Sequence, residues 1–358
     1  MPAQELIPPP HTIPVHWGWL YFLLILTFYL HILFMNAMLG TGIIALFYEF
    51  KPGNKDKNSQ LSREISKKLI FFVAFAVNLG VAALLFLQVL YGQFLYVSSV
   101  LMAVYWLLIV ILLILAYYGT YIYNMRYNYL PLTRKFLILG IVLLFLSVAF
   151  FFSNNMTLML EPQHWRGYFQ NPGGTLLNLQ DPSLVPRYLH FVTASVAVGG
   201  LVIAISGRWK KGNSLSYFQN SLDTGMRWFT AATFIQIILG FLFLISLPQK
   251  VILGFLGGNT LYTAVFIFTL TCSFLLLVLG TLKKLWSSVA TLLLTLVGMV
   301  LMRDFVRSMF LEDYYNLQDL KPSPQYSSFV LFLSALILGV ALIIYLCRKS
   351  LQTSGKES

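Results

Sequence analysis

Stretches of about 20 consecutive apolar residues recur from end to end of this 358-residue chain. A stretch of that length crosses the hydrocarbon core of a bilayer as an α-helix, because a helix rises about 1.5 Å per residue and the core is about 30 Å thick. The stretches are continuous rather than alternating, which excludes a membrane β-barrel. Only 10% of the residues are charged. The sequence therefore predicts an all-α polytopic membrane protein.

We predict nine transmembrane helices in a single transmembrane domain that covers residues 1–358. The outer N-terminal segment is 1–16, the outer loop is 161–187 and the cytoplasmic tail is 347–358. Met1–Pro14 lacks the basic start and apolar core of a cleavable signal peptide, so the first span is expected to direct its own insertion. The predicted spans are Trp17–Phe47, Leu69–Tyr96, Val100–Tyr123, Phe136–Leu160, Tyr188–Ser206, Trp228–Leu247, Thr260–Leu282, Leu285–Arg303 and Ser327–Leu346.

The basic residues set the predicted orientation of these spans. Of the 24 Lys and Arg residues, 18 fall on one side of the membrane and 6 on the other. Cytoplasmic loops carry the excess of Lys and Arg, so the N-terminus is expected outside and the C-terminus in the cytoplasm. The net charge of +12 is then explained by topology and contact with anionic lipid, and no nucleic-acid partner is expected.

Two histidines lie inside the predicted spans, His31 in the first and His190 in the fifth. His11, His16 and His164 fall in segments that are expected to be loops or helix ends. His31 and His190 each lie 16 residues from the inner end of their span, which puts both roughly 24 Å above the inner membrane edge. Ionisable groups at such depth are usually functional, and equal depth suggests that the two act in one layer.

Four further charged residues are predicted to lie at the same level. Asp304 lies roughly 30 Å above the inner edge, Arg303 and Arg307 flank it, and Arg187 precedes His190 by one turn. Neutral imidazole ligates heme iron, and arginine pairs with heme propionates. Both histidines are therefore candidate iron ligands, the three arginines are candidate propionate partners, and Asp304 is either a metal ligand or a counter-ion to arginine.

Simpler explanations apply to each of these residues. An intramembrane histidine can serve as an interhelical hydrogen-bonding residue, and the charged group on the eighth span can be a salt-bridge cluster at the membrane edge. Met156 and Met159 are expected to pack rather than to bind metal. No Cys-x-x-Cys-His motif is present, so no covalently attached heme is expected. Six further polar residues are expected to join helices, namely Asn36, Asn78, Gln88, Asn154, Asn155 and Gln236.

In their order and spacing, five segments resemble subunit I of the cytochrome bd quinol oxidases, over almost the whole chain. The segments are Phe28–Phe34, Gln88–Gly92, Ser153–Pro162, Pro186–Phe191 and Asp304–Arg307. The first is similar to the family's helix with the high-spin heme histidine, and the fourth to its low-spin heme helix. The fifth is similar to the family's Glu-x-Gly-Arg. The resemblance implies nine helices with the N-terminus outside, b-type heme on His31 and His190, and quinol as a partner.

The sequence departs from the family at four places. The seventh span, Thr260–Leu282, has no Met, where the family has an axial ligand to its low-spin heme. Asp304 replaces a glutamate. Val100–Tyr123 has none of the acids that feed protons inward in the family, and the long outer quinol loop is reduced to Pro248–Gly258, whose only charge is Lys250. The usual routes for protons and quinol are therefore missing.

We accordingly predict a membrane-bound b-type heme electron-transfer subunit of a respiratory complex in a bacterial or archaeal inner (plasma) membrane. It would link the quinone pool to a partner cytochrome on the outer side, beside other membrane subunits. One to three heme b groups are expected, with quinone as a further candidate cofactor. Two alternatives stay open: a quinol-oxidising terminal oxidase subunit that reduces O₂, and a heme-poor structural anchor or transporter in a larger membrane complex.

Overall fold

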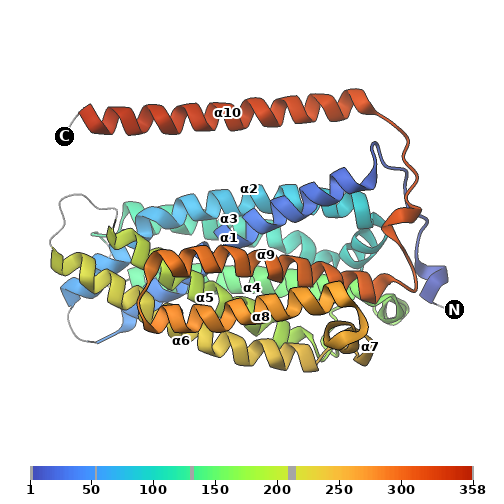
Figure 1. Cartoon of the computed structure of the whole chain (residues 1–358), viewed down its shortest axis with the longest axis horizontal. Helices are drawn as coiled ribbons and strands as arrows, with labels where there is room; N and C mark the ends of the chain where they lie inside the picture. Colours follow the sequence, from blue (N-terminus) through green and yellow to red (C-terminus); the bar gives the residue numbers. More distant parts are fainter. Residues whose placement is uncertain (1–2, 53–54, 130–132, 209–214, 357–358) are drawn as a thin grey trace.

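The chain folds into a bundle of long antiparallel helices. The computed structural model describes residues 3–52, 55–129, 133–208 and 215–356. Within these residues, nine helices are long and apolar enough to cross a membrane, which confirms the predicted all-α polytopic membrane fold. Figure 1 shows the N- and C-terminal ends at opposite ends of the bundle. The end at which α1 begins is called the predicted outer end below.

The helix bounds follow the predicted spans closely. The long helices are α1 (Trp17–Phe50), α2 (Lys55–Leu101), α3 (Ala103–Met125), α4 (Arg134–Leu160), α5 (Leu184–Arg208), α6 (Leu215–Ile245), α8 (Thr260–Thr281), α9 (Leu285–Leu311) and α10 (Tyr326–Lys356). The short elements are η1 (Ala3–Leu6), η2 (Pro162–Phe169), α7 (Gln249–Leu253), η3 (Gly254–Gly258) and η4 (Leu317–Asp319).

Four helices run well beyond the predicted ends of their spans: α6 begins at Leu215 rather than Trp228, α10 ends at Lys356 rather than Leu346, and α2 and α9 are longer as well. Helix α2 begins at Lys55 rather than Leu69, because its charged first turns continue the helix past the apolar stretch from which the span was predicted. Helix α9 continues two turns beyond Arg303 to Leu311. Asp304 and Arg307 therefore lie within a helix, three residues apart, where their side chains can meet on one face.

Helix α1 lies at the centre of the bundle, packed on α2 and α5 and also in contact with α4 and α9. Its closest approach to α5 is at Gly40, where a Cβ atom would collide with the carbonyl oxygen of Ser195 and with the backbone at Gly199. Gly200 on α5 and Gly225 on α6 make a similar backbone contact. Small residues allow this close packing, which van der Waals contact then stabilises in the absence of a hydrophobic force between helices.

The predicted outer end is closed by loop segments that pack on the helix ends. Ile13 and Pro322 form an isolated parallel β-bridge, which ties the N-terminal segment to the segment before α10. The indole Nε1 of Trp165 donates to the carbonyl oxygen of Leu158, which fixes η2 over the end of α4. The predicted ordered cap over 161–187 therefore contains η2 and a series of turns.

Helix α10 stands apart from the other helices over most of its length (Figure 1). None of its side chains that the structure describes is buried. Its predicted outer end touches the bundle, through the ring of Phe329 against Trp19 and that of Phe332 against Phe86.

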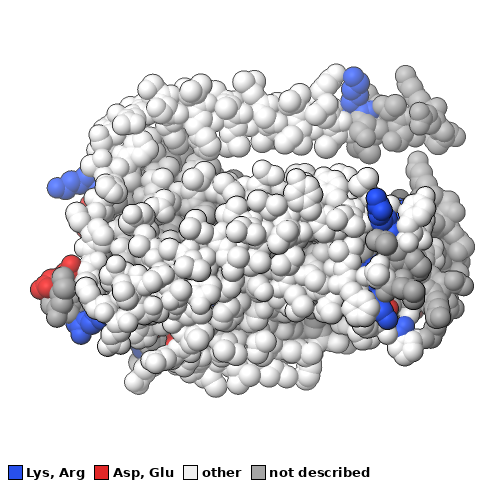
Figure 2. Space-filling model, turned by 180° about the vertical axis from the view of Figure 1, so that it is seen from behind, with Lys and Arg blue, Asp and Glu red and all other residues white. Residues whose placement is uncertain are grey.

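Charged side chains gather at the two ends of the bundle. On the face seen in Figure 2, Lys, Arg, Asp and Glu are confined to the ends, and the surface between them is uncharged. This apolar band matches a chain that is surrounded by lipid along its length.

Candidate functional site

His31 is held on α1 by the backbone of the neighbouring helix. Its Nδ1 lies 2.8 Å from the carbonyl oxygen of Ala76 on α2. A carbonyl oxygen can only accept, so Nδ1 carries the hydrogen and Nε2 keeps a free lone pair. One turn along α2, Gly80 leaves room for the ring, because a Cβ there would lie 2.7 Å from Cε1 of His31. Metal-binding histidines are commonly oriented by such a bond to a backbone carbonyl.

Arg303 lies next to His31 without a carboxylate partner. Its guanidinium packs over the ring of Phe28, with Cζ 4.0 Å from the ring centroid, and the rings of Phe28 and His31 are 6.3 Å apart. No hydrogen bond or ion pair joins Arg303 to another residue in the described part of the chain. The charges of Arg187 and Arg307 both act on it, and its own charge acts on His31. The three predicted arginines thus lie close enough for their charges to interact, and Arg303 among them lies beside His31.

Asp304 and Arg307 form an ion pair on α9. The Arg307 Nη2 atom donates to Oδ1 of Asp304, and the Tyr21 hydroxyl donates to Oδ2 of Asp304 over 2.5 Å. The guanidinium of Arg307 also packs 4.4 Å from the ring centroid of Tyr91, where α2 is kinked. Both carboxylate oxygens are therefore engaged, so in this structure Asp304 is a counter-ion. Its role as a metal ligand stays a prediction.

Arg187 and Arg307 each retain an unused donor. The Nε atoms of both are enclosed and have no hydrogen-bonding partner among the described residues. Arg187 is 5% exposed, donates over 3.4 Å to the hydroxyl of Ser183, and packs over the ring of Phe243. Buried guanidinium donors without acceptors are uncommon, and they point to an acceptor-rich group that the protein is built to hold.

His190 has different surroundings. Its Nε2 lies 2.8 Å from the side-chain nitrogen of Gln236 on α6, and its Nδ1 is enclosed without a partner. Gly240 and Phe243, on the next two turns of α6, lie against the same ring. The two imidazoles, which are predicted at equal depth, thus face different helices, His31 towards α2 and His190 towards α6. No hydrogen bond or ring contact joins them in the described part of the chain, and His190 as an iron ligand stays a prediction.

The outer cap contributes a polar network that touches this layer. Asn178 donates through Nδ2 to Glu161 over 2.7 Å and accepts through Oδ1 from Nδ1 of His164 over 2.8 Å. Its backbone N–H also donates to Asn154. Burial raises the pKa of Glu161 above its ordinary value, and the hydrogen bond from Asn178 opposes part of that rise. His164 is exposed, as predicted for a surface residue.

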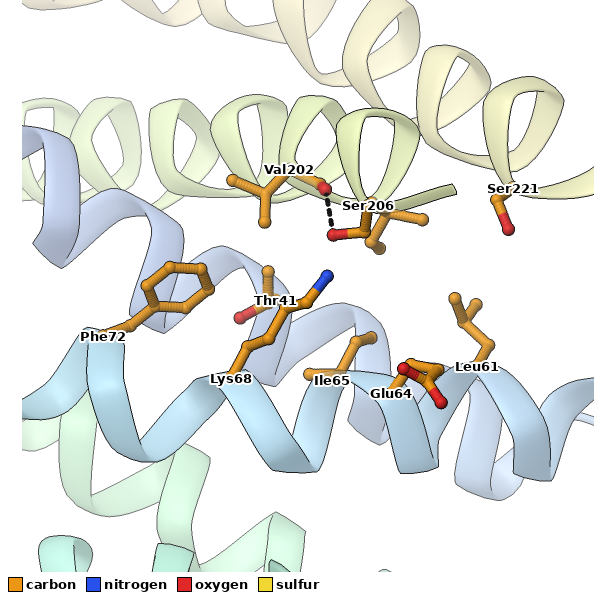
Figure 3. A pocket seen from close by; sticks show the side chains of 10 residues that line it. Thr41, Leu61, Glu64, Ile65, Lys68, Phe72, Val202, Ser206 and Ser221 are labelled. Atoms are coloured by element: carbon orange, nitrogen blue, oxygen red, sulfur yellow. Dashed lines mark hydrogen bonds between the residues drawn. The ribbon is translucent and has the colours of Figure 1, made fainter. Parts of the chain in front are cut away.

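A second buried cluster and a pocket lie at the opposite end, which is the predicted inner end. Glu49 accepts hydrogen bonds from the hydroxyls of Tyr123 and Tyr127 and from Nε of Arg134. A small pocket, partly open to the surface, also lies there, and Figure 3 shows the Lys68 side chain extending into it between α2 and α5. Glu64, Ser206 and Ser221 also line it. Neither feature includes Arg187, Arg303 or Arg307, which are called the arginine layer below.

The sequence identified most of the charged residues in this layer but missed residues that position them. Tyr21, which bonds Asp304, and Gly80, which leaves room for the ring of His31, carry no motif, and their roles appear only when the helices are packed. Glu49, in the cluster at the opposite end, carries no motif either. Among the polar residues predicted to join helices, Gln236 and Asn155 do so, the latter through Ser98 and Ser99 on α2. The prediction is wrong for Asn78, which is exposed and donates to Ala74 on its own helix.

Comparison with known proteins shows the fold alone. The sequence matches no protein-family model and no curated protein. A solved structure, the bd oxidase from Geobacillus thermodenitrificans, contains a chain that is similar to this one with a TM-score of 0.65 and 14% sequence identity. The match covers 93% of this chain and 97% of that chain. The bd-like fold expected from the sequence is therefore confirmed, and the specific likeness to subunit I stays a prediction.

Proposed function

We propose that this chain is a b-type heme subunit of a membrane respiratory oxidoreductase that links the quinone pool to a partner cytochrome at the predicted outer side. The observation that carries the proposal is the pairing of His31, whose Nδ1 is tied to Ala76, with the unpartnered Arg303 beside it. The shared fold with a bd oxidase chain supports it. We expect the chain to reside in the inner or plasma membrane of a bacterium or archaeon.

Charge balance favours an anionic group beside Arg303. Asp304 pairs with Arg307, and the carboxylates of Asp181 and Glu161 act on Arg187, whereas only other arginines act on Arg303. A lipid-surrounded bundle is a poor environment for an uncompensated charge, and a heme propionate would compensate it.

The residues present fit a heme at His31. His31 would bind the iron through Nε2, because Nδ1 is already committed to the carbonyl oxygen of Ala76. Arg303 and the unused Nε atoms of Arg187 and Arg307 would hold the propionates. Tyr21 and Asp304 would keep Arg307 in position. A bound heme would supply one-electron transfer between a quinol and the partner.

A heme assay of the purified chain tests this function. We expect a reduced-minus-oxidised α-band of b type and a matching pyridine hemochrome spectrum, and we expect both to be lost in His31→Ala. His11→Ala is the matched control, because His11 is exposed in the N-terminal segment. Absence of the band from the wild-type protein would contradict the proposal.

Two other candidate functions are separated by further assays. A terminal oxidase would consume O₂ when supplied with quinol, and the solved neighbour is itself a bd oxidase. A heme-poor anchor is favoured by one observation, namely that Gln236 engages Nε2 of His190. Such a subunit would show no pigment but would co-purify with a heme-bearing membrane partner.

A further inference from the structure

We infer that Gln236 keeps His190 out of metal coordination, so that the chain carries a single heme, on His31, and His190 instead joins α5 to α6. The inference rests on the proposed function for its count of hemes. The assignment of the His190–Gln236 pair to helix joining does not depend on heme.

The two imidazoles differ in which nitrogen is free. In His31, Nδ1 is hydrogen-bonded to the backbone of α2. Its Nε2, the usual iron-binding atom, has no hydrogen bond to the described residues and is not enclosed. In His190, Nε2 is hydrogen-bonded to the side chain of Gln236. The remaining atom, Nδ1, is enclosed within the protein, so no lone pair points into open space.

Helix α6 closes over His190 with residues on successive turns. Gln236 meets Nε2, a Cβ at Gly240 would lie 3.2 Å from Cε1, and the Phe243 ring centroid lies 6.2 Å from that of His190. These positions, four and then three residues apart, form one face of a helix. An iron atom at Nε2 would have to displace Gln236, which is itself 7% exposed.

The sequence of α8 agrees with this arrangement. A low-spin heme needs a second axial ligand, and Thr260–Thr281 contains no Met, His or Lys that could supply one. The hydrogen bond between Gln236 and His190 forms without a cofactor, although Oε1 of Gln236 and Nδ1 of His190 are enclosed without partners among the described residues. Such interhelical bonds contribute to the association of membrane helices. The amide of Gln236 suits either imidazole tautomer, because it offers both a donor and an acceptor.

Heme content in three single variants tests the inference. We expect one heme per chain in the wild type, one in His190→Leu with an unchanged α-band and midpoint potential, one in Gln236→Leu, and none in His31→Leu. Two hemes in the wild type, or loss of heme or a shifted midpoint potential in His190→Leu, would overturn the assignment.

A double-mutant cycle keeps the inference testable if the variants are unstable or the chain proves heme-free. His190→Leu and Gln236→Leu should each lower the melting temperature in detergent, and the double variant should melt no lower than the worse single one. Asn78→Leu, at an exposed position on α2 where the side chain donates to its own helix, is the control and should leave melting unchanged. If the decreases in melting temperature add up in the double variant, the two side chains do not interact and the inference is wrong. A heme-free wild type with coupled losses would refute the proposed function but leave the pair standing.

Discussion

At the scale of single residues, Arg303 differs from Arg307 and Arg134 in its partners. Arg303 has a ring beneath it but no carboxylate beside it, whereas Arg307 has Asp304 and Arg134 has Glu49. In those two pairs, a carboxylate of the same chain compensates the charge of the arginine. For Arg303, the proposed function supplies the missing anion as a heme propionate.

Substitution of Arg303 should therefore have opposite effects with and without heme. In the heme-free protein, Arg303→Leu should raise the free energy of unfolding by about 1 kcal/mol, because an uncompensated charge is removed from apolar surroundings. In the heme-bound protein it should weaken heme binding by roughly tenfold, the size of one lost charge-assisted hydrogen bond. Thermal melting and heme titration measure the two effects. Arg126→Leu, at an exposed position, should change neither.

Glu161 should give the outer cap a pH dependence of definite sign. Burial raises its pKa from an ordinary 4.5, so the folded protein binds this proton more tightly than the unfolded chain does. Its contribution to stability is then greatest at low pH and falls as the pH rises from about 4.5 through the raised pKa.

Melting of wild type and Glu161→Gln between pH 4.5 and 7 checks that sign. The wild type should lose stability relative to Glu161→Gln as the pH rises across this range. Glu5→Gln, an exposed position, should track the wild type. A wild type that gains stability relative to Glu161→Gln with rising pH would contradict the burial argument.

At the scale of helices, packing is set by small residues where three helices meet. Gly40→Ala would force a methyl group into the carbonyl oxygen of Ser195. We therefore expect the free energy of unfolding to fall by about 1–3 kcal/mol, the usual range for overpacked cores. Gly140→Ala on α4 is the matched control. Nothing lies within 4 Å of a Cβ at that position, so the same change should be neutral or slightly stabilising. Equal melting temperatures for the two variants would show that α1 and α5 do not pack as described.

Depth along a helix could be predicted from the sequence, but direction around the helix could not. Counting residues placed His31, His190 and the three arginines in one layer, since every residue of a helix adds the same rise. Whether two such residues share a site depends on how each helix is rotated, and here His31 turns to α2 while His190 turns to α6. Gln236 was predicted only as a residue that joins helices, because its partner becomes visible only after packing.

At the scale of the whole molecule, the asymmetry of basic residues predicts how the bundle sits in its membrane. A green fluorescent protein fused after residue 358 should fluoresce, because the C-terminus is expected in the cytoplasm. A cysteine in place of Ala3 should react with a membrane-impermeant maleimide added outside intact cells. The reverse labelling pattern would overturn the orientation, and with it the assignment of the arginine layer to the outer side.

The contact between Gly40 and Ser195 also bears on how the chain is made. Helix α1 is synthesised first, yet the surface that packs against Gly40 belongs to α5, which is synthesised about 150 residues later, roughly 8 to 30 seconds at ordinary rates of translation. During that interval, the Gly40 face of α1 lacks the helix against which it packs in the folded protein. The bundle therefore cannot be completed in the order of synthesis, one helix after another.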